Sequence, residues 1–150
     1  MKHTIIILAL SLVTGSFYAQ QIKESEVPAE VKKSQEQNFP GLKVTKWEKE
    51  GKNYEAEFMS NKVETSAEYD AKGILLGTET EINVSELPKS ITDYFAKNKP
   101  GKKIKEASKI VRPTGDLNYE AEVEGTDYIF DSNGALLRSE RDKEKDDDKK

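Results

Sequence analysis

The chain contains two copies of one sequence unit. The motif SEVP at residues 25–28 returns as SELP at residues 85–88, and Pro-Gly at residues 40–41 returns at residues 100–101, both at an offset of 60 residues. The pentapeptide NYEAE at residues 53–57 recurs unchanged at residues 118–122, at an offset of 65 residues. Internal repeats of this length are single supersecondary units stacked side by side. The duplication therefore restricts the fold to two copies of one small motif.

Each copy opens with a predicted helix, over residues 27–38 and over residues 87–98. Pro28 and Pro88 suit a helix start, because the first turn leaves its backbone N–H groups unbonded in any case. Both helices are predicted to end at Pro-Gly, which cannot continue them. The second helix has the clearer apolar stripe, formed by Leu87, Ile91, Tyr94 and Phe95.

Strands and turns follow each helix. Strands are predicted over residues 44–48, 54–59, 63–69 and 74–82 in the first copy, and over residues 104–111, 119–124, 126–131 and 135–139 in the second. Residues 131–134 (DSNG) are interpreted as a hairpin turn, because a calcium-binding EF-hand loop needs about 12 residues. The predicted fold is α+β, with two tandem repeats of one helix plus a three- to four-stranded antiparallel sheet. We expect the repeats to join into one curved sheet with the helices on one face.

The two ends of the chain have different compositions from the repeats. Residues 1–20 have Lys2, an apolar run over residues 5–13 and then small residues, which is the layout of a signal peptide with cleavage near Ala19. The absence of cysteine favours a bacterial periplasmic or secreted protein with no membrane anchor after cleavage. Residues 139–150 are charged and predicted to be disordered. The repeats are expected at residues 21–82 and 83–138.

The motifs of both copies resemble the PepSY-like, beta-lactamase-inhibitor-protein-like domain family of secreted bacterial proteins. In the first copy they are VP at residues 27–28, FPG at 39–41, YEAE at 54–57 and YDAKGILL at 69–76. In the second copy they are LP at residues 87–88, KPG at 99–101, YEAE at 119–122 and FDSNGALL at 130–137. The resemblance implies a tandem helix-plus-sheet fold whose open sheet face binds another protein, with inhibition of an enzyme as the suggested role.

The residue types exclude much of catalysis. The chain has no cysteine and one histidine, His3, which lies in the predicted leader, so nucleophilic Cys-His and Ser-His chemistry and zinc sites on imidazole or thiolate are not expected. No catalytic, cofactor-binding or metal-binding residue is predicted, and the protein is not expected to be an enzyme. A formal net charge of −4 also argues against a nucleic acid partner.

The glutamates of the two NYEAE copies are the candidate binding residues. In a strand, Tyr and Ala of this motif point to one face and its glutamates to the other. We therefore expect an exposed charge stripe balanced by lysines of the preceding strands, with too little burial to shift a carboxylate pKa strongly. The expected stripe consists of Glu55, Glu57, Glu120 and Glu122, and the expected lysines are Lys46, Lys105 and Lys109.

Two aromatic residues complete the candidate site. Trp47, the single tryptophan, stands where the second copy has Ala107, and Tyr128 stands where the first copy has Ala67. Each is either core filling or a recognition anchor. The predicted function is an exported, non-enzymatic protein that recognises another exported or envelope protein. The alternative is a sensor or scaffold of the periplasm that binds cations or envelope components.

Overall fold

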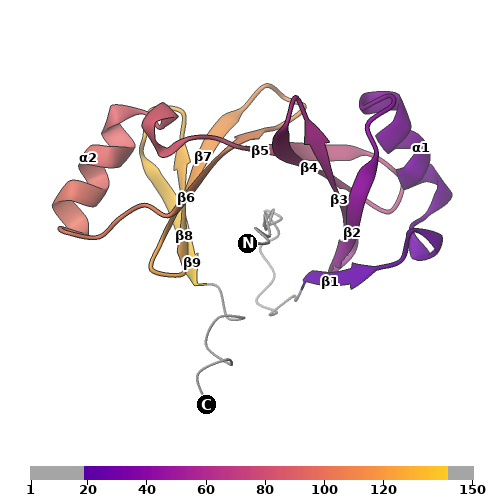
Figure 1. The fold of residues 1–150 in the computed structure, drawn as a ribbon, viewed down its shortest axis with the longest axis horizontal. Coiled ribbons are helices and arrows are strands. Elements are labelled where there is room, and N and C mark those ends of the chain that lie inside the picture. Colours follow the sequence, from indigo (N-terminus) through magenta and orange to yellow (C-terminus); the bar gives the residue numbers. More distant parts are fainter. Residues whose placement is uncertain (1–18, 142–150) are drawn as a thin grey trace, which may run out of the picture. The chain divides into compact units, whose positions relative to one another are not determined.

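The computed structural model describes residues 19–141, so the predicted leader up to residue 18 and the tail from residue 142 lie outside the described residues. The chain divides into two compact units, Met1–Thr80 and Glu81–Lys150, and each is described by itself. The division lies two residues before the boundary expected from the repeats. Figure 1 shows the elements of both units.

The first unit holds one α-helix and five strands. Its elements are β1 (Ala19–Ile22), the 3-10 turn η1 (Glu24–Glu26), α1 (Ala29–Asn38), β2 (Val44–Glu50), β3 (Asn53–Ser60), β4 (Val63–Tyr69) and β5 (Leu75–Glu81). The second unit repeats the pattern with η2 (Val84–Glu86), α2 (Lys89–Asn98), β6 (Glu106–Val111), β7 (Leu117–Val123), β8 (Thr126–Asp131) and β9 (Leu136–Arg141).

The strands lie in chain order within each unit, β1 to β5 in the first and β6 to β9 in the second, and neighbouring strands of each unit are antiparallel. The fold class is thus confirmed as antiparallel α+β, but three to four strands per repeat is too few for the first unit. Its extra strand, β1, begins at Ala19, inside the predicted leader, and pairs with β2. The prediction of disorder from residue 139 is also wrong up to Arg141, because β9 pairs with β8 over these residues. These residues carry no apolar side chain, but strand pairing is made by backbone hydrogen bonds, which do not require one.

Both helices begin two residues later than predicted and end where predicted. Pro28 and Pro88 are the residues just before the helices, and a 3-10 turn precedes each. In these turns the Glu26 carboxylate accepts a hydrogen bond from the Lys23 N–H at 2.9 Å, and Glu86 accepts one from the Asn83 N–H at 2.8 Å. The repeated SEVP and SELP motifs are therefore capped turns that set the direction in which each helix enters.

Each unit packs its helix on one face of its strands, as Figure 1 shows for α1 beside β2 to β4. In the first unit Trp47, Ala56 and Ala67 lie opposite one another across β2, β3 and β4. In the second unit the matching row is Ala107, Ala121 and Tyr128 across β6, β7 and β8. Each row thus has one large aromatic side chain and two alanines, with the aromatic at opposite ends. All six side chains are buried.

A second pair of core positions also differs between the units. The Tyr69 hydroxyl donates a 2.7 Å hydrogen bond to Gln35 Oε1 of α1, and both side chains are buried. The second unit has Phe130 and Phe95 at these positions, with ring centroids 5.6 Å apart at 74°. A buried polar side chain needs its partner, so the polar pair in one unit is replaced as a whole by an apolar pair in the other.

The hairpin turns before β5 and β9 touch the helices. In the second unit Asp131 Oδ1 accepts hydrogen bonds from the N–H groups of Asn133 and Ala135, which confirms the interpretation of this stretch as a turn. Gly73 of the first unit has φ of +80°, and a Cβ there would lie 2.5 Å from the backbone oxygen of Glu30. Glycine is required there by conformation and by the closeness of α1.

Candidate functional site

The face of the first unit's sheet that points away from α1 carries a set of glutamates, which we call the glutamate face. Strand register places Glu48, Glu55 and Glu68 opposite one another across β2, β3 and β4. The next row holds Lys46 and Glu57, followed by Ser66 and Glu79. The exposed fractions of the five glutamates are 6% for Glu48, 4% for Glu55, 6% for Glu57, 3% for Glu68 and 1% for Glu79.

This burial contradicts the prediction of an exposed, solvated charge stripe. Alternation was correct about the side of the sheet, since Glu55 and Glu57 lie opposite Tyr54, Ala56 and Phe58. It was wrong about solvent, because neighbouring strands are only about 4.8 Å apart and glutamates in adjacent strands cover one another's stems. Three carboxyl groups in one row also repel one another, which an isolated surface glutamate does not experience.

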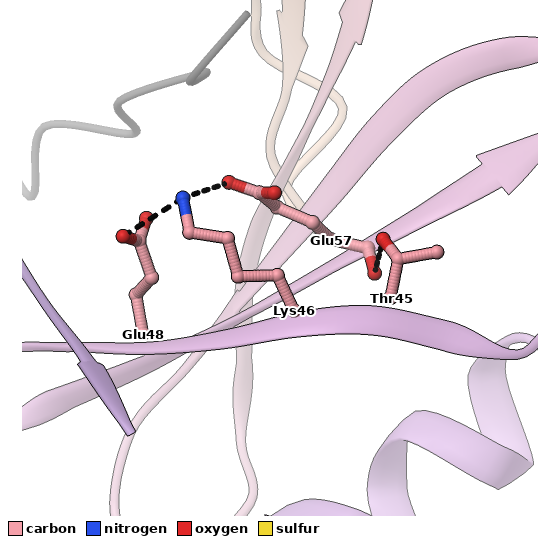
Figure 2. Close-up of polar contacts among 4 residues, drawn as sticks. All are labelled: Thr45, Lys46, Glu48 and Glu57. Carbon is pink, nitrogen blue, oxygen red and sulfur yellow. Dashed lines mark hydrogen bonds and ion pairs between the residues drawn. The ribbon is translucent and has the colours of Figure 1, made fainter. Parts of the chain in front are cut away.

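Lys46 partly compensates this charge. Its ammonium Nζ lies 2.9 Å from Glu48 Oε1 and 2.9 Å from Glu57 Oε1, as Figure 2 shows. Burial lowers the pKa of Lys46, but the two carboxylates outweigh burial and hold the pKa above its ordinary value. The Thr45 hydroxyl donates a 3.0 Å hydrogen bond to the Glu57 backbone oxygen, at the irregular register between Val44 and Lys46. This β-bulge directs Lys46 toward the two carboxylates.

Glu55 is the least compensated of these carboxyl groups. Its Oε1 is buried without a hydrogen-bond partner, and so is Oε2 of Glu48. Burial raises the pKa of Glu55 well above its ordinary value, the charges of Glu48 and Glu57 raise it further, and the Ser66 hydroxyl acts in the opposite direction. The expectation that no carboxylate pKa would shift strongly is therefore wrong. Glu68, by contrast, accepts a 2.8 Å hydrogen bond from the side-chain amide of Asn53.

The matching face of the second unit is less acidic. Its row opposite Glu120 has Ser108 in place of Glu48, and Ile129 in place of Glu68. Glu120 is partly buried, and burial together with the Asp127 charge raises its pKa to about 8. Arg138 acts in the opposite direction.

The lysines of the second unit divide between the two faces. Glu122 is 5% exposed, and the Lys105 ammonium lies 3.2 Å from it, as predicted. Lys109 is not a partner of these glutamates, because it lies opposite Tyr119 on the helix-facing side. The position of a lysine in the preceding strand therefore does not tell on which face of the sheet its side chain lies, because the strand register decides this.

The two candidate aromatic residues lie away from the glutamate face. Trp47 packs with Val31 and Phe58, and Tyr128 packs with Phe95 at a centroid distance of 5.1 Å. Each is 6% exposed and faces its helix. Of the alternatives open at the level of sequence, the structure places both side chains in the cores.

Sequence reasoning missed Glu48 and Glu68 as members of the site. A signal for Glu48 was present in the turn, since Gly51 and Lys52 form a two-residue connection closed by the pair Glu50 and Asn53. Counting back from that closing pair brings Glu48 opposite Glu55.

The site carries carboxylates, hydroxyls and one lysine. A catalytic carboxyl must reach its substrate at about 2.6–3.2 Å. Glu48, Glu55 and Glu57 are only 4–6% exposed. Their oxygens do come close together, since one oxygen of each lies within 4.8 Å of the others. No helix among residues 19–141 has the length and apolar character needed to cross a membrane.

Comparison with known families identifies the fold. The family model described as "Putative beta-lactamase-inhibitor-like, PepSY-like" matches residues 17–77 and again residues 52–138. The chain belongs to this family, as its motifs indicated. None of the curated proteins matches the chain in sequence.

Solved structures share the fold at low sequence identity. A DUF2874 family protein from Bacteroides uniformis has 21% identity and a TM-score of 0.65, covering 75% of this chain and 88% of its own. A BLIP-like protein from Bacteroides fragilis has 22% identity and a TM-score of 0.56, covering 75% and 85%. A Bacteroides eggerthii structure described as "putative periplasmic proteins" has 17% identity and a TM-score of 0.66, covering 76% and 88%.

Proposed function

We propose that this chain is a non-enzymatic binding protein of the bacterial periplasm, which recognises another protein with the glutamate face of its first unit. Family membership and the similar periplasmic structures support the class and the compartment. The absence of cysteine, and of histidine outside the predicted leader, supports a role without catalysis. Inhibition of a partner enzyme is the role that the family's description suggests for it.

The observation that carries the proposal is an exposed methionine at the end of the glutamate face. Met59 follows Glu57 by two residues on β3, so it lies on the same face, and it is 49% exposed. An unbranched, polarizable side chain of this kind is common in adaptable protein-binding surfaces. A solvated methionine next to buried carboxylates gives the partner one apolar anchor beside a region of negative charge.

The hairpin next to Met59 has an unusual backbone. Asn61 and Lys62 of the β3–β4 turn have positive φ angles of 51° and 68°. The second unit has Gly125 at the second position of the matching turn, with φ of 70°. A non-glycine residue in this conformation costs about 1 kcal/mol, and such costs concentrate at functional sites. Lys62 therefore places a side chain at the tip of the β3–β4 turn, at a position where glycine would adopt the backbone conformation with less strain.

The charge of the face indicates the chemistry of the partner. Complementary charge across an interface directs encounter and selects partners more than it raises affinity. A partner that fits this surface offers lysine or arginine side chains around an apolar pocket for Met59. Trp47 and Tyr128 are not part of the proposed surface, because each packs in the core between the strands and the helix of its own unit.

Site-specific photo-crosslinking tests the proposal. A photoreactive amino acid at position 59 should form one discrete adduct in periplasmic extract of the source bacterium, whereas the same group at Lys33, exposed on α1, should not. Once the partner is identified from the adduct, Met59→Ala should weaken its binding about tenfold, as expected for an interface anchor. Equal adducts from both positions, or an unchanged affinity of Met59→Ala, would refute the assignment of this face.

A further inference from the structure

The first unit gathers more negative charge on the glutamate face than its own residues neutralise. Glu48, Glu55 and Glu57 each direct one carboxylate oxygen to within 4.8 Å of the others. Lys46 is the one basic side chain on this face among the described residues of β1 to β5, and it contacts Glu48 and Glu57. With all three carboxyl groups ionised, two negative charges remain uncompensated within this group.

Two buried oxygens of the group are free to act as ligands. Glu48 Oε2 and Glu55 Oε1 have no hydrogen-bond partner, and these residues are only 6% and 4% exposed. A buried carboxylate oxygen without a hydrogen-bond donor destabilises the folded state, so folding alone gives no reason to keep it. Lys46 contacts the other oxygen of Glu48, Oε1, and Oε1 of Glu57, so Glu48 Oε2 and Glu55 Oε1 are not occupied by Lys46.

The spacing fits a hard divalent cation. Calcium takes oxygen ligands at about 2.3–2.6 Å, so two oxygens that share one ion lie at most about 5 Å apart. The 4.8 Å limit of the three glutamate oxygens falls inside this range. Calcium also accepts carboxylates in one- or two-oxygen contact with flexible geometry, whereas magnesium requires near-ideal octahedral geometry at about 2.0–2.1 Å.

We propose that Glu48, Glu55 and Glu57 bind one divalent cation of calcium's size on the glutamate face of the first unit. The ion supplies the two positive charges that Lys46 does not. Lys46 acts as the counter-ion when no cation is bound, and its positive charge lowers the affinity of the three glutamates for the cation. The site does not depend on a protein partner, so it stands or fails separately from the proposed function.

The second unit provides the internal comparison. Glu120 and Glu122 correspond to Glu55 and Glu57, but Ser108 replaces Glu48. Arg138 also acts on Glu120, with a positive charge that the first unit lacks at this place. The trio is therefore incomplete in the second unit, and a stoichiometry of one ion per chain is expected.

Isothermal titration of the purified protein with calcium chloride tests the site. Wild-type protein should bind one ion with a dissociation constant of about 0.1–1 mM, the range of extracellular calcium modules. Glu55→Gln should weaken binding at least about tenfold, because it removes a charged ligand. The matched control Glu120→Gln in the second unit should leave the affinity unchanged.

A second variant separates a cation site from a structural effect. Lys46→Gln removes the competing ammonium, so it should bind calcium more tightly by about tenfold. Far-UV circular dichroism should match wild type for all three variants. Absence of saturable binding up to about 10 mM calcium, equal loss in Glu55→Gln and Glu120→Gln, or weaker binding in Lys46→Gln would each overturn the proposal.

Discussion

Replacing Tyr69 with phenylalanine tests how the first unit tolerates the loss of one partner from the buried polar pair of Tyr69 and Gln35. The variant removes the 2.7 Å hydrogen bond from the Tyr69 hydroxyl to Gln35 Oε1. Gln35 Nε2 already has no hydrogen-bond partner, so the whole amide would then be buried and unpaired. Leaving such a group unsatisfied costs about 1–3 kcal/mol of the free energy of unfolding.

The compensating change is visible in the second unit, where both positions are phenylalanine. Tyr69→Phe combined with Gln35→Leu removes both polar partners together, so it should restore stability to within about 1 kcal/mol of wild type. The two changes should thus be coupled by about 1–2 kcal/mol in a double-mutant cycle.

Urea unfolding followed by tryptophan fluorescence measures this coupling. The chain has one tryptophan, and Trp47 is buried in the core of the first unit, so its emission reports that unit. If the free energy of unfolding falls by about 2 kcal/mol per molar urea, a variant that loses about 2 kcal/mol of stability has a urea midpoint about 1 M lower. If the double variant loses as much as the two single variants combined, the cost does not come from an orphaned polar group.

Two further predictions concern a turn and a titrating carboxyl group. Gly73→Ala should destabilise the protein by several kcal/mol more than Gly41→Ala, since both have positive φ but only Gly73 would place its Cβ 2.5 Å from the Glu30 backbone oxygen. Equal urea midpoints for these two variants would contradict the close contact with α1. Burial and the Asp127 charge raise the pKa of Glu120 from 4.5 to about 8, so its stabilising contribution is complete below pH 4.5 and is lost as pH rises to about 8. Glu120→Gln should abolish this part of the fall in melting temperature between pH 4.5 and 8, and a variant curve parallel to wild type would refute the role of burial.

The sequence was sufficient to predict the duplication, the last residue of each helix, and the side of the sheet on which the glutamates of the two NYEAE copies lie, because these depend on local sequence patterns. It was insufficient for Trp47, because alternation sets Val44 and Trp47 on opposite faces. In the structure Val44 lies opposite Phe58 and Trp47 opposite Ala56, so both face α1. The bulge at Thr45 reverses the alternation between them, and a bulge leaves no mark in the periodicity of a single strand.

Burial of the glutamates could not be read from β3 alone for a related reason. Whether Glu55 meets solvent depends on which side chains flank it on β2 and β4, and these are Glu48 and Glu68. Strand pairing brings together residues that a turn separates in the sequence. The carboxyl groups of two neighbouring strands then raise the pKa of the carboxyl group between them, an effect that the sequence of one strand does not show.

The two units also show which of their features the fold requires. On the helix-facing side, each difference between the units is compensated by another. One aromatic residue and two alanines fill each row, and the polar pair of the first unit is replaced by an apolar pair in the second. On the opposite side they do not cancel, because the row of Glu48, Glu55 and Glu68 becomes Ser108, Glu120 and Ile129. The second unit has the same arrangement of strands with only one carboxyl group in this row. Three adjacent carboxyl groups are therefore not needed for folding, and their mutual repulsion destabilises the folded state. The fold therefore does not account for the three carboxyl groups of the first unit, which is why the proposed binding of a cation and of a partner protein is tested on the glutamate face of that unit.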